Sequence, residues 1–480
     1  MIDLMKLEKL RTCGRLETFS TARHHLGLYK LVGCTATYTS TKSGASIEQL
    51  IFAAVRHVVL KHPNLSAIPI SEDQSYPNVY FARLPEIDLR TCVEFHIRKS
   101  PLPGDGERDE ELEALLTKEH QRDFKHEHGP YTFWRLVVLT CCDDSNVFTA
   151  SWFFHHALAD GASAVIFHES FLAGLMNADW ETESEPIVSS PDTALLPPLE
   201  ELHPMSISWP FFLQAISRAL LPSIFDRRPH GLWTGKCVPE IISSQSVPCH
   251  RTTVLSAQET TALARACRRE TTSVTAALQC LLGAVLLANL PDTEYDRICI
   301  QGPMSIRPLL AVKHDQMTNA ISAYSYVHTR ATATVGVEEE SQETVMRHFS
   351  WDEARAVKST IAAVVAKQGR DNPIALLKYV SDMPKYFLDK RGKPRMPSAE
   401  MSNIGLWKSK QGGEDDWAIG RMTFSQCPAL TSSPMAVNII TGGDGNAVVH
   451  FCWNPEAVEE RFMDGVIEQF QLGVEALLLE

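Results

Sequence analysis

The most informative part of this chain is the sequence Ser151-Trp152-Phe153-Phe154-His155-His156-Ala157-Leu158-Ala159-Asp160-Gly161. Its apolar start predicts a buried β-strand that ends on two histidines. An aspartate follows four residues after the second histidine, and a glycine closes the loop. Further apolar residues then recur at helical spacing: Ala164, Phe167, Phe171 and Leu175. The pattern predicts a strand, a loop and a helix, which can project polar side chains from rigid elements.

Histidine is suited to act as a general base here, because its pKa lies near neutrality without much adjustment. The spacing of His156 and Asp160 can bring the carboxylate close to the imidazole within one loop. A buried aspartate also needs a cationic partner. Arg307 ends a strand that reads as buried and precedes Pro308, so it is our candidate. A single histidine after a strand is usually structural, but the complete pattern favours a functional site.

The length of the chain predicts more than one domain. With 480 residues it exceeds the size at which a single hydrophobic core usually grows. We predict a first lobe over residues 1–180 and a second over 251–480. Between them, residues 181–250 lack clear periodicity and contain acidic and proline-rich segments, so we expect a crossover linker.

Several elements can be placed from periodicity and capping signals. Strands are expected at 26–39, 133–140, 147–154 and 297–306, and a run of strands from Met401 to Trp453. Helices are expected after the capping boxes Ser46/Gln49 and Ser256/Glu259, over 274–290 and 457–478, and within 337–367.

Composition excludes several classes of function. The net charge of −13 argues against binding to nucleic acids or anionic membranes. No apolar stretch reaches the roughly 20 residues that span a bilayer, and the N-terminus lacks a secretory pattern, so we expect a cytoplasmic protein. The twelve cysteines are scattered without any C-x-x-C spacing, which predicts neither a disulfide framework nor a structural metal.

The motif from His155 to Gly161 resembles the signature of the CoA-dependent acyltransferase superfamily. This superfamily includes chloramphenicol acetyltransferase, plant BAHD acyltransferases and nonribosomal peptide condensation domains. The likeness is closest to the fungal alcohol acetyltransferase-like branch. Supporting segments are Leu16–Gly27, Ser305–Pro308 and Ser402–Gly405, so the resemblance extends over nearly the full chain.

The resemblance implies an α/β (α+β) fold of two lobes, each a mixed β-sheet flanked by helices, with an active-site tunnel between them. His156 would deprotonate the hydroxyl or amine of the acceptor, which then attacks the thioester carbonyl. Asp160 would have a structural role and pair with Arg307. His155 would position the loop, and Gly161 would allow the tight turn into the helix.

Two further groups of residues are candidates for binding. Acyl transfer needs hydrogen-bond donors near the developing oxyanion, and Ser402 and Asn403 lie in the segment that resembles the family strand near the active site. CoA phosphates would need a basic patch, for which the candidates are Lys390, Arg391, Lys393 and Arg395. The Asp-Phe-Gly-Trp-Gly signature of plant BAHD enzymes is missing, so a plant-type phenolic specificity is not implied.

We therefore predict a monomeric O-acyltransferase that uses acetyl-CoA as co-substrate and a small alcohol or secondary metabolite as acceptor. No permanently bound cofactor is expected. One alternative is a stand-alone condensation-type enzyme that takes a carrier-protein thioester and forms an amide or ester. Another is a non-catalytic binding module of the same fold. The sequence does not identify the acceptor or the acyl chain length.

Overall fold

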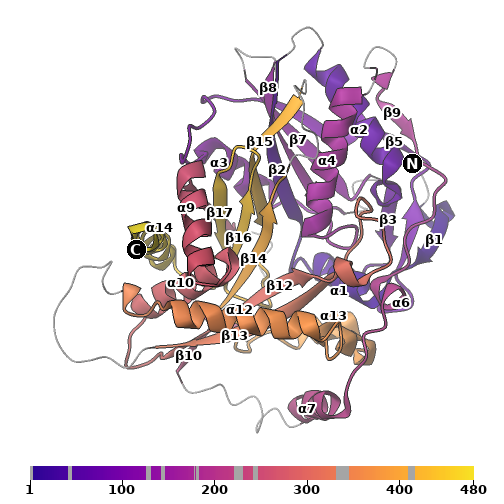
Figure 1. Cartoon of the computed structure of the whole chain (residues 1–480). Helices are drawn as coiled ribbons and strands as arrows, with labels where there is room; N and C mark the ends of the chain where they lie inside the picture. Colours follow the sequence, from indigo (N-terminus) through magenta and orange to yellow (C-terminus); the bar gives the residue numbers. More distant parts are fainter. Residues whose placement is uncertain are drawn as a thin grey trace.

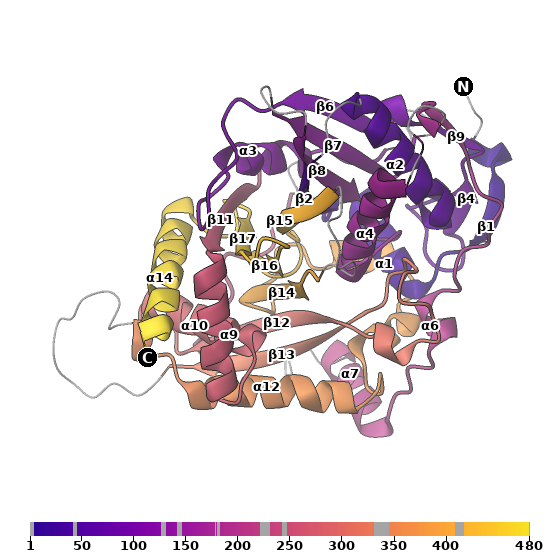
Figure 2. The same cartoon turned by 45° about the horizontal axis from the view of Figure 1, so that its top comes forward.

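The fold is described by a computed structural model, which covers residues 4–41, 46–125, 131–141, 146–177, 179, 183–220, 231–241, 247–330, 345–408 and 417–479. Two mixed sheets form the centres of two lobes, and helices flank both sheets (Figures 1 and 2). This is the α/β architecture that the sequence predicts.

The first lobe is built on a five-stranded sheet with the order β15-β2-β8-β7-β6. Strands β6 and β7 are parallel and the other pairs are antiparallel. Helix α4 packs against α2 and covers β2 and β15 (Figure 1). The main elements of this sheet and its helices are α1 (Arg15–His25), β2 (Val32–Ser40), α2 (Ile47–Lys61), β6 (Val93–Ile97), α3 (Glu110–Glu119), β7 (Trp134–Thr140), β8 (Val147–Phe154), α4 (Gly161–Asn177) and β15 (Trp417–Gln426).

Smaller elements surround this sheet and connect the lobes. One small sheet has the order β1-β4-β3, and β5 pairs with β9. These strands are β1 (Glu8–Thr12), β3 (Ala67–Ile70), β4 (Tyr80–Arg83), β5 (Glu86–Asp88) and β9 (Ile187–Ser189), and the connection between the lobes contains α6 (Leu199–Leu202) and α7 (Trp209–Leu220).

The second lobe holds a seven-stranded sheet with the order β10-β12-β14-β16-β17-β11, and β13 pairs with β12. Helix α10 is buried on nearly all sides because it packs between α9, α12, α14 and the sheet. The elements are β10 (Leu232–Trp233), β11 (Cys249–Leu255), α9 (Ala257–Arg269), α10 (Val274–Ala288), β12 (Arg297–Ser305), β13 (Ile321–Thr329), α12 (Trp351–Ala366), α13 (Met383–Leu388), β14 (Ala399–Leu406), β16 (Met435–Thr441), β17 (Ala447–Trp453) and α14 (Glu460–Leu479).

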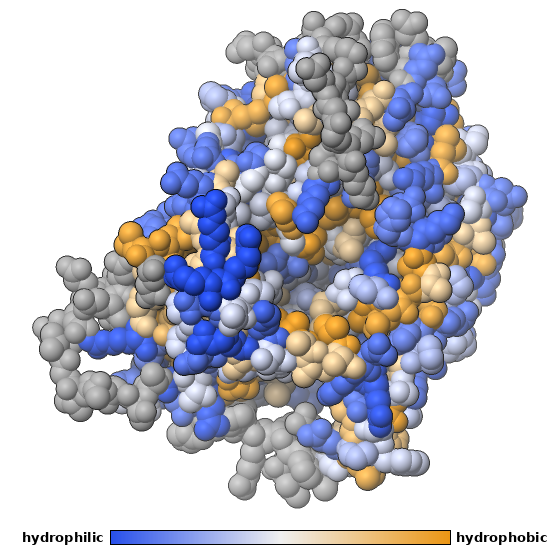
Figure 3. Space-filling model, in the orientation of Figure 1, coloured by the Kyte–Doolittle hydropathy of each residue, from blue (hydrophilic) through white to orange (hydrophobic). Residues whose placement is uncertain are grey.

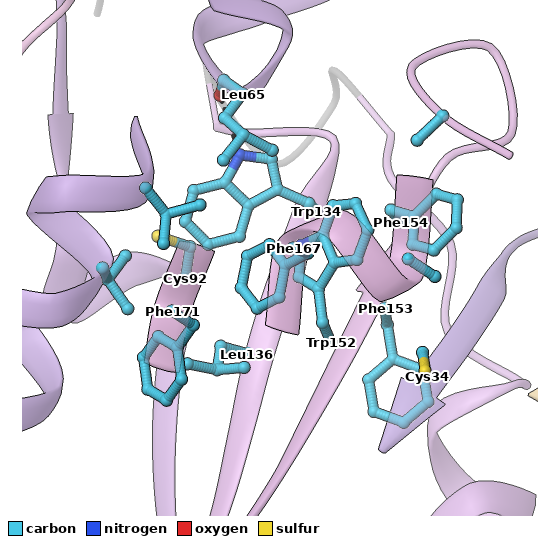
Figure 4. Close-up of a cluster of buried hydrophobic side chains, with 14 of the residues drawn as sticks. Cys34, Leu65, Cys92, Trp134, Leu136, Trp152, Phe153, Phe154, Phe167 and Phe171 are labelled. Carbon is cyan, nitrogen blue, oxygen red and sulfur yellow. Dashed lines mark hydrogen bonds between the residues drawn. The ribbon is translucent and has the colours of Figure 1, made fainter. Parts of the chain in front are cut away.

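Aromatic packing fixes the strand that carries the histidine pair. Trp152 stacks on Phe154 at 4.1 Å and on Phe167 of α4 at 4.3 Å between ring centroids. Trp134 on the neighbouring strand donates its indole N–H to the carbonyl of Leu65 at 2.7 Å. Figure 4 shows these rings gathered in one buried cluster. Burial of such large rings contributes strongly to stability, so the end of β8 has a well-defined position.

One strand crosses between the lobes. Strand β15 belongs to the second half of the sequence but pairs antiparallel with β2 of the first lobe. Its residues Met422 and Phe424 are buried in the core of the first lobe. The division of the chain at residues 180 and 250 remains a prediction, and the sheet of the first lobe includes this later segment.

Some local expectations differ from the structure. The predicted strand over 26–39 begins only at Val32, because α1 covers 15–25 and Gly27 follows in a left-handed conformation with φ of 68°. Apolar spacing in the sequence does not reveal helix α1, because the buried face of this helix includes Thr18, Ser20 and Thr21. Ser256 and Glu259 form the predicted capping box, whereas the Ser46 side chain makes no cap hydrogen bond. Part of the predicted helical region 337–367, residues 337–344, lies outside the described residues.

Within the described ranges, no single helix has the length and hydropathy to span a bilayer. Helices α9 and α10 reach those values only together, and they are bent by 96° relative to each other.

Candidate active site

The site lies where β8 ends and α4 begins. The backbone N–H of His155 donates to the carbonyl of Phe133 at 2.9 Å, which continues the pairing of β8 with β7 for one residue. Strand pairing sets Phe154 opposite both Val32 and Trp134. The two histidines therefore follow directly from a strand that is held on both sides.

His155 is fully buried and bound on both ring nitrogens. Its Nδ1 accepts the backbone N–H of Ala157 at 3.0 Å, and its Nε2 lies 3.0 Å from Oε1 of Glu72. His24 approaches the same carboxylate through Nδ1 at 3.1 Å, while its Nε2 accepts the N–H of Phe124 at 3.2 Å. Because the outer nitrogens accept backbone hydrogens, the inner nitrogens carry the protons. His24 donates to Glu72, and the Nε2–H of His155 faces the same carboxylate at ion-pair distance.

The protonation of this cluster follows from burial and its hydrogen bonds. Burial opposes the charge of Glu72, but the two histidines outweigh it and lower the pKa of that carboxyl to about 2. Burial lowers the pKa of His155 to about 4. The three side chains are close enough to surround a metal ion. A metal would need the lone pairs of the inner nitrogens, which the tautomers do not offer, so a hydrogen-bonded cluster fits better.

His156 has different surroundings and is partly exposed. The side-chain amide of Asn319 donates to its backbone carbonyl at 2.7 Å, and the ring lies 5.8 Å from the ring of Tyr29. Burial and the positive charge of Arg23 lower the pKa of His156 to about 4. The imidazole is therefore neutral at pH 7. Nδ2 of Asn319 lies 3.5 Å from Nδ1 of the ring, and no hydrogen-bonding group of the described residues contacts Nε2. With the proton of the neutral ring on Nδ1, Nε2 is the nitrogen that can accept a proton.

Asp160 is 1% exposed and accepts hydrogen bonds on both oxygens. Oδ1 accepts from the N–H of Ser163 at 2.8 Å and from its hydroxyl at 2.9 Å. Oδ2 accepts the backbone N–H of Ala320 at 3.0 Å. Burial would raise the pKa of this carboxyl, but Arg307 and these donors hold it below its ordinary value.

Arg307 reaches Asp160 from the second lobe. Its Nη2 lies 2.9 Å from Oδ1 of Asp160, and its N–H groups donate to the carbonyls of Gln316 and Thr318 at 2.7 Å. We call residues 155–160, between β8 and α4, the histidine loop. Residues 307–320 are called the strap, because this segment of the second lobe lies against that loop. Nδ2 of Asn64 adds a bridge, since it donates to Leu158 of the loop and to Met317 of the strap.

Gly161 begins α4 and packs closely against side chains of β14 and β15. Its φ does not lie in the left-handed region, so the turn does not itself require glycine. A Cβ there would collide with Cδ1 of Ile404 and approach Cζ of Phe424 at 3.3 Å. The expectation that Gly161 serves a tight turn is thus replaced by close packing against β14 and β15.

Strand β14 places the two predicted oxyanion residues, Ser402 and Asn403, on its opposite faces. Nδ2 of Asn403 donates to the hydroxyl of Thr275 on α10 at 3.0 Å, and its Oδ1 accepts the N–H of Gly405 at 2.8 Å. Ala399 and Met401 lie on the same side, in the core of the second lobe. Ser402 lies on the opposite face, beside Asn438 of β16. Of the two predicted residues, Ser402 therefore faces away from the core of the second lobe and Asn403 faces α10.

The predicted basic patch is divided in a similar way. Arg395 is 3% exposed, and its guanidinium donates to the carbonyls of Lys236, Leu430 and Ser432. Its burial lowers its pKa to about 10. Arg391 and Lys393 are exposed, and Lys390 lies over the ring of Tyr386 at 4.4 Å. Arg395 joins backbone segments, so only the other three can bind a ligand at the surface.

Sequence reasoning missed Glu72 and Asn319. Glu72 lies in a polar segment, Ser71-Glu72-Asp73-Gln74, that reads as an exposed turn. Asn319 lies in the strap, far from any motif. No local signal distinguishes either residue, because each acts through a contact made across the fold.

Comparisons with known proteins place the chain in one family. A family model described as alcohol acetyltransferase matches residues 12–453. The chain is 34% identical over 472 residues to the probable alcohol acetyltransferase crmB of Aspergillus fumigatus, which covers 94% of this chain and 96% of that protein. A probable alcohol acetyltransferase of Fusarium pseudograminearum is 25% identical over 485 residues, covering 97% and 95% of the two chains.

Solved structures share the two-lobed fold. The trichothecene 15-O-acetyltransferase of Fusarium sporotrichioides superposes with a TM-score of 0.66 at 12% identity, covering 97% of this chain and 95% of that chain. The first condensation domain of the calcium-dependent antibiotic synthetase gives 0.60 at 12% identity, with 99% and 97% covered.

Proposed function

From the premise that this chain belongs to the alcohol acetyltransferase family and is an O-acyltransferase, we propose that it moves an acetyl group from acetyl-CoA to a hydroxyl of a small molecule, with His156 as general base. The observation that carries the proposal is the free Nε2 of a partly exposed, neutral His156. His155, one residue away, has both nitrogens engaged and cannot serve.

The reaction proceeds in two steps. Nε2 of His156 takes the proton of the acceptor hydroxyl while its oxygen attacks the thioester carbonyl carbon. The tetrahedral intermediate carries the charge on the former carbonyl oxygen, and the Ser402 hydroxyl is our candidate to donate to it. Collapse breaks the carbon–sulfur bond, and the imidazolium returns its proton to the leaving thiolate. The products are an acetyl ester and CoA.

Hydrogen bonds and an ion pair hold the residues around His156 in place, which favours its action as a base. Asp160 and Arg307 fix the end of the loop, the Glu72 cluster fixes His155, and Asn319 holds the carbonyl of His156. A base held in one orientation avoids the entropic cost of alignment during reaction. Asp160 touches no reacting atom in this scheme and is a positioning residue.

Acetyl-CoA as donor is the finer part of the proposal. A protein of the same fold, the starter condensation domain of rhizomide synthetase, is in complex with C8-CoA, with a TM-score of 0.59. We assign the CoA phosphates to Lys390, Arg391 and Lys393. A carrier-protein donor is not favoured, because the family model and the relative that match this chain are described as alcohol acetyltransferases. We further propose a cytoplasmic monomer that acts in secondary metabolism, with a tunnel between the lobes.

The test is incubation of the purified chain with acetyl-CoA and a panel of alcohols and amines. Free thiol release is followed, and products are identified by mass. We expect acceptor-dependent thiol release and an acetyl ester from at least one alcohol. Transfer to amines alone, or only from a carrier-bound thioester, would contradict the proposal.

A further inference from the structure

A second polar pair flanks His156, and the reaction scheme does not use it. The first member is Arg23 on α1, whose guanidinium lies between the rings of Phe19 at 4.5 Å and Tyr29 at 4.4 Å. These rings hold the planar group rigidly. Its buried Nε has no hydrogen-bond partner, and no carboxylate of the described chain pairs with the group.

The second member is Glu400 on β14. It alternates with Met401 of the second-lobe core and so shares the opposite face with Ser402. The cross-strand neighbour of Ser402 is Asn438, which accepts a hydrogen bond from Gln426, the partner of Tyr29 in the first lobe. No hydrogen bond or ion pair to its carboxylate occurs among the residues that the structure describes. Burial raises the pKa of Glu400, and the charge of Arg23 offsets part of that effect.

The two side chains come from different lobes. Arg23 and the ring of Tyr29 lie close to the reacting base, and Glu400 faces them from the other lobe. Arg23 influences the pKa of both His156 and Glu400, and Tyr29 lies between the guanidinium and His156. The hydroxyl of Tyr29 donates to Gln426 at 2.6 Å, which fixes the ring. Arg23 and Glu400 are both partly exposed, yet they do not close into an ion pair. Figure 3 shows a hollow near the middle of the molecular surface, on the face of Figure 1.

An unpaired guanidinium and an unpaired carboxylate in such surroundings are costly unless a polar molecule lies between them. Each offers what the other lacks, since the arginine donates hydrogen bonds and the carboxylate accepts them. A molecule with a second hydroxyl can satisfy both, because that group accepts from Arg23 through its oxygen and donates its hydrogen to Glu400.

We infer that Arg23 and Glu400 select acceptors that carry a second hydroxyl close to the one that is acetylated. The inference rests on the proposed function, with His156 as the base, and it deepens that function by naming the substrate class. The preferred acceptor is a polyhydroxylated small molecule rather than a simple alkanol. A simple alkanol leaves both charged groups without a partner, which penalises it in the transition state.

The experiment compares acceptors that differ by one hydroxyl, such as 1-hexanol with 1,2-hexanediol and cyclohexanol with cis-1,2-cyclohexanediol. The value of kcat/KM is measured for each with saturating acetyl-CoA. We expect the diol to exceed the alkanol by roughly 30-fold or more, since sites built to bind a hydroxyl discriminate strongly. Glu400→Gln and Arg23→Gln should each reduce this ratio by about tenfold.

Matched controls are Glu475→Gln on α14 and Arg265→Gln on α9, both exposed. They remove the same charges far from the histidine loop, and the ratio should stay at the parent value. Circular dichroism and melting temperature establish that each variant is folded. If a variant at 23 or 400 is unfolded, Arg23→Met and Glu400→Met, which remove the charge but keep an unbranched side chain, give the same comparison.

The inference is overturned if the parent transfers acetyl groups to diols and alkanols equally well, or if folded variants at 23 and 400 keep the full preference. Those results would mean that only water occupies the space between the two groups. Failure of the proposed function looks different, because the folded parent would then release no thiol with any acceptor.

Discussion

His155 and His156 are adjacent in sequence and opposite in function. The ring of His155 is locked by the backbone of Ala157 and by Glu72, so its proton stays where it is. His156 is restrained through its backbone by Asn319, and its Nε2 stays open. The contrast arises because the chain turns directly after β8, with the N–H of Leu158 donating to the carbonyl of His155, so that the two rings meet different groups. The pattern of the motif alone therefore identifies the pair, but only the contacts assign the base.

A small change at the buried carboxylate of Glu72 should have a large effect on the stability of the protein. Glu72→Gln keeps the shape but offers an N–H to one of two histidine N–H groups, which leaves a buried donor unsatisfied. We expect a loss of about 1–3 kcal/mol in the free energy of unfolding, measured by urea denaturation. The neighbouring Asp73 is exposed, so Asp73→Asn is the control. Equal stability of Glu72→Gln and the parent would contradict the cluster described above.

At the scale of elements, the strap joins the second lobe to the histidine loop. Its ion pair and its backbone hydrogen bonds gather around Asp160 and Ser163. These contacts are formed only when both lobes are folded and packed. The site is therefore sensitive to any change that weakens the contact between lobes.

Arg307→Gln should destabilise the protein by about 3–5 kcal/mol, because Asp160 is left buried with its charge uncompensated. Asp160→Asn should lower both the free energy of unfolding and the rate of acetyl transfer. Expressed as free energies, the loss of stability should be at least as large as the loss of activity. Combining both changes should cost less than the sum of the two, as measured in a double-mutant cycle. Strict additivity would contradict the pairing, and Arg268→Gln on the exposed face of α9 is the control.

The loop after α13 allows a test of the assigned phosphate contacts. Neutralising Lys390, Arg391 and Lys393 together should raise the KM for acetyl-CoA about tenfold or more and leave melting unchanged, because their charges are at the surface. Arg395→Gln should instead lower the melting temperature, since Arg395 joins three backbone segments. An unchanged KM in the triple variant would remove the patch from the donor site.

The limits of prediction from sequence are visible in these elements. The strand β8 and helix α10 could be predicted because apolar periodicity is local. The pairing of Arg307 with Asp160 could be predicted because Arg307 stands in a segment that resembles the family motif. The face of Asn403, the burial of Arg395 and the space required at Gly161 could not, because each depends on a distant partner: Thr275, the carbonyl of Leu430 and Ile404 respectively. The position of β15 in the first sheet likewise depends on contacts between parts of the chain that are far apart in sequence.

At the scale of the whole molecule, buried neutral histidines link stability to pH. Burial lowers the pKa of His62, His155, His156 and His168 to about 4, and that of His450 to about 3. The unfolded chain binds these protons near pH 6.5, whereas the folded chain resists them. The contribution of these neutral histidines to stability is therefore fully present above pH 6.5, and it is lost as the pH falls toward 4.

We expect the free energy of unfolding, measured in urea at pH 7.5, 6.0 and 5.0, to fall progressively. Five linked groups predict a loss of several kcal/mol across this window, by about 1.4 kcal/mol per group and pH unit at full coupling. Constant stability from pH 7.5 to 5.0 would show that these histidines are protonated in the folded state.

The most direct test of the account is acetyl transfer by His156→Ala. With acetyl-CoA and the best acceptor, thiol release should fall by about 10²–10⁴-fold, the usual contribution of a general base. The melting temperature should stay close to that of the parent, and His25→Ala, which changes an exposed histidine on α1, should transfer normally. A folded His156→Ala variant that releases thiol at nearly the parent rate would show that His156 is not the base.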